Sequence, residues 1–408
     1  MSAHNLTSLT GRRRGPGLDV AVVGGGMAGA AAVLALARLG LKCCLIDRAV
    51  PEPWSADDEV DLRVVGLAPS SMALLDELGV WPAIRAGRTG IYRKMHVWDA
   101  ATGASIDFDA ASRGEAELGR IVENRLVQSA LWQALDAAGV RRLCPARVTG
   151  VEQREDRINL RLAEPVDESG DLLSARLVVA ADGSDSPLRE MVGIDVRRRD
   201  YGQMAVVAHV RTERPHADTA WQRFLGTGPV ALLPLADGRS SLVWSLPADE
   251  ARRVLALPAD AFMQELGVAT DFRLGRILDT TKRAGFPLRL QLAQAYVAGR
   301  MVLLGDAAHT VHPLAGQGVN LGLRDVVELR NCLQQGLQAG LAVDTPEVLA
   351  RYGRRRQSAN TLDALSFDGL ARVYGWQSLP AQMLRGLGIR LVDRLAPLKR
   401  RLLDHASG

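Results

Sequence analysis

Three short apolar runs along the chain each lead into a turn that contains glycine. They read DVAVVG at 19–24, LVVAAD at 177–182 and MVLLGD at 301–306. Continuous runs of this length are typical of strands buried on both faces, as in a parallel sheet covered by helices. Stretches of helical character follow the first and third runs, so the pattern predicts βα units.

A different period marks the middle of the chain. Residues 201–212 read YGQMAVVAHVRT and residues 228–235 read GPVALLPL, with alternation of apolar and polar positions. This period predicts an open, mostly antiparallel sheet over a substrate site. The sequence thus predicts an α/β protein divided into a flexible basic tail at 1–17, a discontinuous nucleotide-binding domain at 18–190 and 283–345 (with part of 90–115 joining the substrate sheet), an inserted substrate sheet at 191–282, and C-terminal helices at 346–408.

The composition is that of a globular protein with a large core. Hydrophobic residues make up 47% and charged residues 24% of the 408 residues, which excludes wholesale disorder. The four cysteines form no CxxC pair, so we expect a reduced, cytoplasmic protein without a disulfide framework or a metal site. From Arg351 onward, eleven Lys or Arg stand against four Asp. This basic end suggests a docking surface, and no nucleic-acid-binding signature accompanies it.

The turn after the first apolar run satisfies the dinucleotide fingerprint GxGxxG. Gly24, Gly26 and Gly29 would supply a tight turn, close approach of a pyrophosphate, and close packing of helix on strand. The following helix offers its N-terminal amides and dipole to phosphates. The next strand, KCCLID, ends at Asp47, whose carboxylate can accept both ribose hydroxyls of an adenosine. Glycine-rich turns also serve packing alone, but an acid at this place favours FAD or NAD over NADP.

The other two apolar runs lead to turns that contain an acid. Asp182-Gly183 follows the second run, and Gly305-Asp306 follows the third, ahead of Gly316 and Gly318. An acid at a strand end can bind a chain of hydroxyls, and glycines let the backbone approach a flat ring. A helix beginning near Asn320 would direct its dipole at that ring and stabilise a reduced flavin. Asp182-Gly183 taken alone is equally compatible with a common turn.

In this order the three motifs resemble those of the class A flavin monooxygenases, aromatic hydroxylases built like para-hydroxybenzoate hydroxylase. The likeness covers nearly the whole chain and implies a Rossmann-like FAD-binding domain, with Asp47 at the adenosine ribose and Asp306 at the ribityl chain. In that family the Asp-Gly motif serves both FAD binding and use of the nicotinamide cofactor. The resemblance also places Arg63 and Arg125 near the FAD phosphates or ribityl chain. The residues expected to bind FAD are Gly24, Gly26, Met27, Ala28, Gly29, Asp47, Arg48, Arg63, Arg125, Val148, Asp182, Gly183, Gly305, Asp306, Pro313, Gly316, Gln317, Gly318, Val319 and Asn320.

Within this class the chain resembles the UbiH/UbiF/UbiI (VisC-type) hydroxylases of ubiquinone biosynthesis, in the stretches 61–81, 118–135, 221–235, 241–247 and 305–326. The likeness implies hydroxylation of a polyprenylated phenol or quinol by O2 through a flavin C4a-hydroperoxide, with NAD(P)H as electron donor and a biosynthetic complex as a further partner. UbiF-type hydroxylation of demethoxyubiquinol is the leading interpretation, ahead of the UbiI-like C5 and UbiH-like C1 reactions. One departure is Asp47, where the family often has Glu, although the shorter side chain still reaches a ribose.

Three other functions stay open: a hydroxylase of small soluble aromatics, a flavoprotein that reduces isoprenoid double bonds, and a non-catalytic FAD-binding member of a complex. The expected chemistry needs a dry cavity and orientation more than side-chain catalysts, so the sequence identifies no catalytic base. We interpret His309 and His312 as structural residues rather than proton donors. Trp244, on an alternating strand, is interpreted as core.

The C-terminal segment combines apolar and basic positions. From Leu379 to Leu403, leucines recur at helical spacing among arginines and lysines. Such a segment can lie on an anionic membrane or a partner, which would hold the protein at the inner face of the cytoplasmic membrane. The simpler interpretation is that its apolar face packs on the body. Gly386, Gly388 and Pro397 also argue against one continuous helix.

Overall fold

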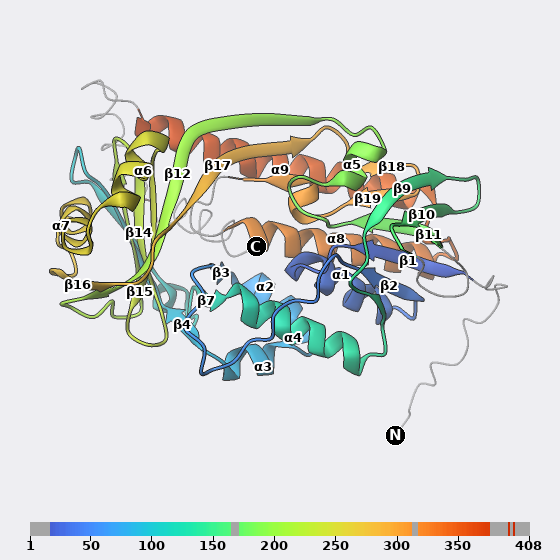
Figure 1. The fold of residues 1–408 in the computed structure, drawn as a ribbon, viewed down its shortest axis with the longest axis horizontal. Helices are drawn as coiled ribbons and strands as arrows, with labels where there is room; N and C mark the ends of the chain where they lie inside the picture. Colours follow the sequence, from blue (N-terminus) through green and yellow to red (C-terminus); the bar gives the residue numbers. More distant parts are fainter. Residues whose placement is uncertain (1–16, 165–170, 312–316, 376–390, 392–394, 396–408) are drawn as a thin grey trace.

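A computed structural model describes residues 17–164, 171–311 and 317–375, together with Leu391 and Leu395. A mixed sheet covered by helices lies beside a larger, mostly antiparallel sheet (Figure 1). The predicted α/β class, with an inserted antiparallel sheet and C-terminal helices, is confirmed.

The first sheet has a parallel centre. β19, β11, β1, β2 and β8 pair in that order, and β18, β9 and β10 extend it in the antiparallel sense. Val20, Ala21 and Val22 of β1 are fully buried, as the continuous apolar run predicts. The strands are β1 Leu18–Val23, β2 Cys43–Ile46, β8 Arg141–Leu143, β9 Val148–Gln153, β10 Ile158–Leu162, β11 Leu172–Ala180, β18 Val297–Ala298 and β19 Met301–Leu303.

Helices from distant parts of the chain share one core with this sheet. α1 follows β1 through the glycine turn and packs against α4 and α8, and α9 packs on α8. The helix expected near Asn320 begins slightly earlier, at Gln317. The helices are α1 Met27–Ala37, α2 Pro69–Glu77, α3 Trp81–Ala86, α4 Asn124–Ala137, α5 Pro187–Met191, α8 Gln317–Gln338 and α9 Pro346–Gly375.

The second sheet has the order β20-β17-β12-β15-β14-β13-β5-β6, with β16 beside β12. Neighbouring strands are antiparallel, apart from the parallel pair β13 and β5. A small sheet of β3, β7 and β4 lies between this sheet and the helices. The strands are β3 Val64–Leu67, β4 Thr89–Tyr92, β5 Lys94–Asp99, β6 Ser105–Asp109, β7 Gly119–Glu123, β12 Val196–Thr212, β13 Thr219–Leu225, β14 Gly228–Pro234, β15 Ser240–Pro247, β16 Ile277–Thr280, β17 Ala284–Ala293 and β20 His309–Thr310.

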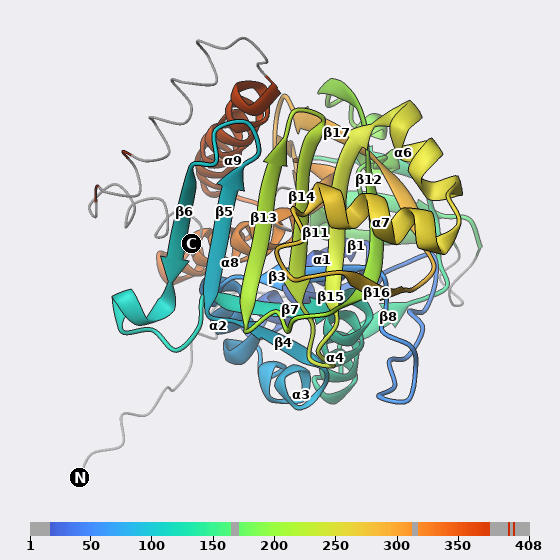
Figure 2. The same ribbon diagram turned by 90° about the vertical axis from the view of Figure 1, so that its left-hand side faces the viewer.

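The two faces of the second sheet have different neighbours. On the outer face, Val206 and Trp244 pack beneath α6 Ala248–Ala256 and α7 Ala259–Ala269, which cover the sheet in Figure 2. Trp244 is 5% exposed, so its prediction as a core residue is confirmed. On the inner face, Ala205 and Val207 line a cavity. The alternating pattern predicted the strands, but not the two covering helices.

The amphipathic stretch from Leu379 to Leu403 lies outside the described residues, apart from Leu391 and Leu395, which are exposed. In the described part of the chain, no helix combines the length and apolar character needed to cross a membrane.

Candidate functional site

The glycine turn after β1 is shaped by contacts that only glycine allows. Gly24 has φ +107°, and a Cβ there would lie 2.2 Å from the carbonyl oxygen of Ala181. A Cβ on Gly29 would lie 1.9 Å from the carbonyl oxygen of Gly24, so α1 packs directly on the turn. A Cβ on Gly26 would meet nothing within 4 Å. The turn thus leaves open space where α1 begins.

This open space fits a pyrophosphate. Gly26 caps α1, and among the described residues no side chain accepts a hydrogen bond from the first turn of the helix. Met27 and Ala28 are half-buried in that turn, so the helix presents its N-terminus to the open side. Free amides and the positive dipole end are the features that bind phosphates at helix N-termini.

Asp47, at the end of β2, is tied to the glycine turn. One carboxylate oxygen accepts a hydrogen bond from the backbone N–H of Gly25, and the other accepts one from Ala49 at 3.0 Å. Each oxygen keeps a further lone pair for a ribose hydroxyl. Arg48 is exposed beside it. Val148 is the first residue of β9. It lies near Asp47, since Ala146, two residues earlier, donates its N–H to the carbonyl oxygen of Asp47 at 2.7 Å.

Two side chains on α4 hold the glycine turn from behind, and sequence reasoning did not identify them. Gln128 Nε2 and Trp132 Nε1 both donate to the carbonyl oxygen of Gly25, at 2.9 and 2.8 Å. A Cβ on Gly25 would lie 2.5 Å from the Trp132 ring. The stretch 118–135 was singled out by resemblance, but nothing local in it indicates this contact.

Asp182 carries an oxygen that a ligand can satisfy. Its Oδ2 accepts from the N–H of Leu188 at 3.2 Å, whereas Oδ1 is buried and has no hydrogen-bond partner among the described residues. Burial raises the pKa of Asp182, against the opposing effects of hydrogen bonds and the charge of Arg189. Gly183 follows at φ +93°. A buried polar atom without a partner commonly marks a place where water or a ligand binds.

Arg189 connects the second motif to the third. It is fully buried, and its Nη1 donates to the carbonyl oxygens of Ser184 at 3.0 Å and Ala307 at 2.9 Å. The Asp182-Gly183 and Gly305-Asp306 turns are therefore held side by side, as expected for strands β11 and β19, which pair in parallel.

Asp306 faces the cavity at the end of β19. The Asp306 side chain is exposed on the side of the cavity, whereas protein atoms surround it on the other sides. The resulting loss of hydration raises the pKa of the carboxyl group. Gly305 has φ +61°, and a Cβ there would lie 3.3 Å from the Cβ of Ala28. The first and third motifs thus meet where α1 and the Gly305 turn touch.

The start of α8 is described only in part. Gly318 and Val319 are half-buried, whereas Pro313, Gly316 and His312 lie outside the described residues, as does the side chain of Gln317. Asn320 is fully buried and its side chain is already engaged. Its Nδ2 donates to the carbonyl oxygen of Gly66 at 2.8 Å, and its Oδ1 accepts from Ala68 N–H at 3.0 Å and from Ser71 Oγ at 2.7 Å. Asn320 can therefore contact FAD only through its backbone.

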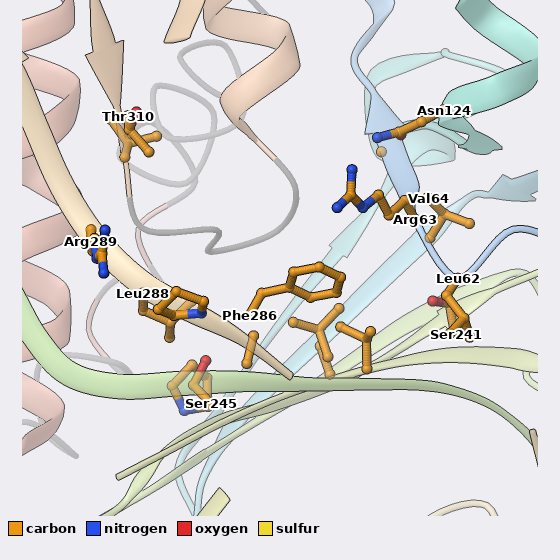
Figure 3. A pocket seen from close by; sticks show the side chains of 18 of the residues that line it. Leu62, Arg63, Val64, Asn124, Ser241, Ser245, Phe286, Leu288, Arg289 and Thr310 are labelled. Atoms are coloured by element: carbon orange, nitrogen blue, oxygen red, sulfur yellow. The ribbon is translucent and has the colours of Figure 1, made fainter. Parts of the chain in front are cut away.

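A cavity of about 570 Å³ lies between the second and third motifs, where Ser184, Asp185 and Asp306 line it, and the second sheet. Figure 3 shows Arg63 and Phe286 directed toward each other in it, and the guanidinium carbon lies 5.1 Å from the ring centre. Its sheet side is mostly apolar, with a few polar groups. The lining residues on β12 to β15 are Ala205, Val207, Gln222, Pro229, Ala231, Leu233, Ser241, Val243 and Ser245, and those on β17 and β20 are Phe286, Pro287, Leu288, Arg289, Gln291 and Thr310.

The two arginines assigned by resemblance have different surroundings. Arg63 is exposed to the cavity. Arg125 does not line it, and its Nη2 donates to the carbonyl oxygen of Pro53 at 2.8 Å and to Asp58 at 2.9 Å. Arg125 thus anchors the 53–58 segment, and its predicted contact with FAD stays a prediction.

His309 fits the structural role predicted for it. The side chain is 1% exposed, and its Nε2 lies 2.6 Å from Oδ2 of Asp325. Asp325 was not identified from the sequence, although it lies within the stretch 305–326.

Known proteins match this arrangement over almost the whole chain. Residues 17–362 match the FAD binding domain family. The 3-demethoxyubiquinol 3-hydroxylase of Escherichia coli is 37% identical, over 96% of this chain and 98% of that protein. The ubiquinone hydroxylase UbiL of Rhodospirillum rubrum is 37% identical over 96% of this chain and 89% of its own length. The human ubiquinone biosynthesis monooxygenase COQ6 is 33% identical, covering 95% and 92% of the two chains.

Solved structures share the fold at lower sequence identity. The p-nitrophenol 4-monooxygenase PnpA from Pseudomonas putida superposes with a TM-score of 0.74 at 18% identity, over 96% of this chain and 98% of that one. Klebsiella pneumoniae HpxO, complexed with FAD and uric acid, gives 0.73 at 20% identity, over 96% and 97%. With the fingerprint turn, the strand-end acids and these relatives together, the chain belongs to the FAD binding domain family and, within it, to the FAD-dependent monooxygenases of ubiquinone biosynthesis.

Proposed function

We propose that this protein hydroxylates the ring of a polyprenylated phenol or quinol in ubiquinone biosynthesis, with a demethoxyubiquinol as its substrate. The observation that carries the proposal is the cavity between Asp306 and the apolar inner face of the second sheet. The identity of 37% to the E. coli 3-demethoxyubiquinol 3-hydroxylase supports the choice of ring position.

FAD, once bound and reduced by NAD(P)H, supplies the activation of O2. In this proposal the chain binds it in three places. The N-terminus of α1 and Gly26 bind the pyrophosphate, Asp47 binds the adenosine ribose, and Asp306 binds the ribityl hydroxyls. Asp182, whose Oδ1 has no partner in the described part of the chain, belongs to the turn next to that of Asp306 and can bind the cofactor or the nicotinamide donor.

The second sheet orients the ring and excludes water. Val207, Leu233 and Val243 give its inner face an apolar surface, on which a substituted ring can lie. Gln222 and Ser245 are polar groups in that surface, suited to hydrogen bonds with ring hydroxyl and methoxy oxygens. A site that excludes water also prevents the hydrolysis of reactive intermediates.

The oxygen source tests this function. Purified protein is supplied with a prenylated demethoxyubiquinol, NAD(P)H and isotopically labelled O2. The product should gain one oxygen atom that carries the label, since hydroxylation by a flavin takes its oxygen from the gas. Mass spectrometry separates the alternatives. An added oxygen without the label comes from water and contradicts the proposal. A gain of two hydrogens indicates an isoprenoid reductase, and an unchanged substrate indicates a non-catalytic role.

The same proposal includes a C-terminal tail, residues 379–403, that faces the membrane. A polyprenylated substrate resides in the bilayer, and the chain ends in the amphipathic, basic stretch from Leu379 to Leu403. Leu362 and Leu365 on α9 are 61% and 60% exposed, shortly before this stretch. Apolar residues among cations bind anionic bilayers through combined burial and charge.

Vesicle co-sedimentation tests the tail. The full chain should sediment with anionic vesicles at low salt and less at high salt, because salt screens the attraction of surface charges. A chain ending near Leu379 should stay in the supernatant under both conditions. If the shortened chain is folded and binds anionic vesicles as well as the full chain, the tail is not the anchor.

A further inference from the structure

Asp325, on α8, is fully buried at the centre of a polar network. Its Oδ2 accepts a hydrogen bond from the backbone N–H of Gly305 at 3.0 Å and lies 2.6 Å from Nε2 of His309. Gly305 and His309 flank Asp306 on either side. One carboxylate oxygen therefore fixes both ends of the short segment that presents Asp306 to the cavity.

Helix α9 holds the other oxygen of Asp325. Arg356 Nε donates to Oδ1 at 2.6 Å, and Asn360 Nδ2 donates to the same atom at 3.1 Å. Arg356 Nη2 also donates to Asn360 Oδ1 at 2.6 Å, so the two α9 residues brace each other. Asn360 Nδ2 further contacts Tyr296 Oη at 3.2 Å, and the Tyr296 ring stacks on His309.

The charge balance of this network keeps Asp325 ionised. Burial would raise its pKa, but His309 and Arg356 outweigh that effect and lower the pKa to about 2. An ionised carboxylate is a stronger acceptor for the Gly305 N–H than a neutral one. Gly305 is in the left-handed region, so its conformation sets the direction in which Asp306 leaves the strand.

We propose that Arg356 and Asn360 are positioning residues for the cofactor site. They fix Asp325, Asp325 fixes the Gly305 turn, and the turn directs Asp306 toward the ribityl chain. Neither α9 residue lines the cavity, so each acts on FAD only through this relay. If the network served stability alone, its loss would lower the unfolding temperature and leave FAD affinity unchanged.

FAD titration of the full chain, freed of cofactor, tests the relay. Arg356→Met should weaken FAD binding roughly 10-fold, about the effect of losing one well-directed hydrogen bond between Asp306 and the ribityl chain. Arg356→Lys should restore part of the affinity, and Asn360→Ala should cause a smaller loss. Arg355→Met is the matched control on the same helix, because Arg355 is exposed and pairs with Glu328 at 2.8 Å; it should bind FAD as the parent does.

The visible circular dichroism of bound flavin gives an independent readout. In Arg356→Met saturated with FAD, the flavin bands should differ from those of the parent, because Asp306 is displaced. A folded Arg356→Met protein with parental affinity and parental bands overturns the proposal. If Arg356→Met does not fold, Asn360→Ala decides: weakened FAD binding supports the relay, and unchanged binding refutes it.

Discussion

Replacing Asp306 by Ala is expected to yield a colourless protein that has lost most of its FAD. The carboxylate faces the cavity from the end of β19, and none of the described residues donates a hydrogen bond to it. Its hydrogen-bonding capacity is therefore free for ribityl hydroxyls. Loss of two hydrogen bonds to a charged group corresponds to roughly a 100-fold or greater loss of affinity. Absorbance of the purified protein and FAD titration of the apoprotein measure the effect.

Two further variants separate affinity from folding. Asp306→Asn keeps the shape and one acceptor oxygen, so it should bind FAD with intermediate affinity. Asp279→Ala removes an exposed acid on β16 at the far sheet edge and should keep its colour. An Asp306→Ala protein that is yellow after purification, with parental affinity, would remove Asp306 from the cofactor site.

The sequence predicted those parts of the fold whose pattern is local. β1, β11 and β19 lie where continuous apolar runs predicted buried parallel strands, because burial on both faces demands such runs. α6 and α7 were not predicted, although their start signals are present. Pro247 and Pro258 precede them, and acids occupy the first turn of each. Each of these short helices buries only one face against the sheet. The alternating strands on either side therefore give the stronger pattern in the sequence.

Long-range partners in the site could not be predicted in the same way. Gln128 and Trp132 reach Gly25 across more than a hundred residues, and Arg356 reaches Asp325 from another helix. Such pairs depend on how helices pack, which no local spacing specifies. The contact predicted between Asn320 and FAD stays a prediction, and the fold restricts it to the backbone. The motif suggested a flavin contact, whereas the fold engages its whole side chain with the segment from Gly66 to Ser71.

Two alanine substitutions in the glycine turn are expected to have different effects: one destabilises the fold, and the other weakens FAD binding. In Gly29→Ala the new methyl carbon would lie 1.9 Å from the backbone oxygen of Gly24, which no side-chain movement can relieve. α1 must then move off β1, at a cost of about 3 kcal/mol or more in folding free energy. Gly26 has φ −65°, which alanine adopts readily, and open space around its Cβ position. Gly26→Ala should therefore fold normally.

The methyl group of Gly26→Ala instead occupies the space that the pyrophosphate needs. FAD affinity should fall roughly tenfold or more, because backbone approach to the phosphates is blocked. Thermal unfolding of the two apoproteins and FAD titration distinguish the effects: Gly29→Ala lowers the unfolding temperature, whereas Gly26→Ala keeps it and loses affinity. If Gly26→Ala binds FAD as tightly as the parent, the pyrophosphate does not pass this residue, and the assignment of the open side of the turn to phosphate binding is wrong.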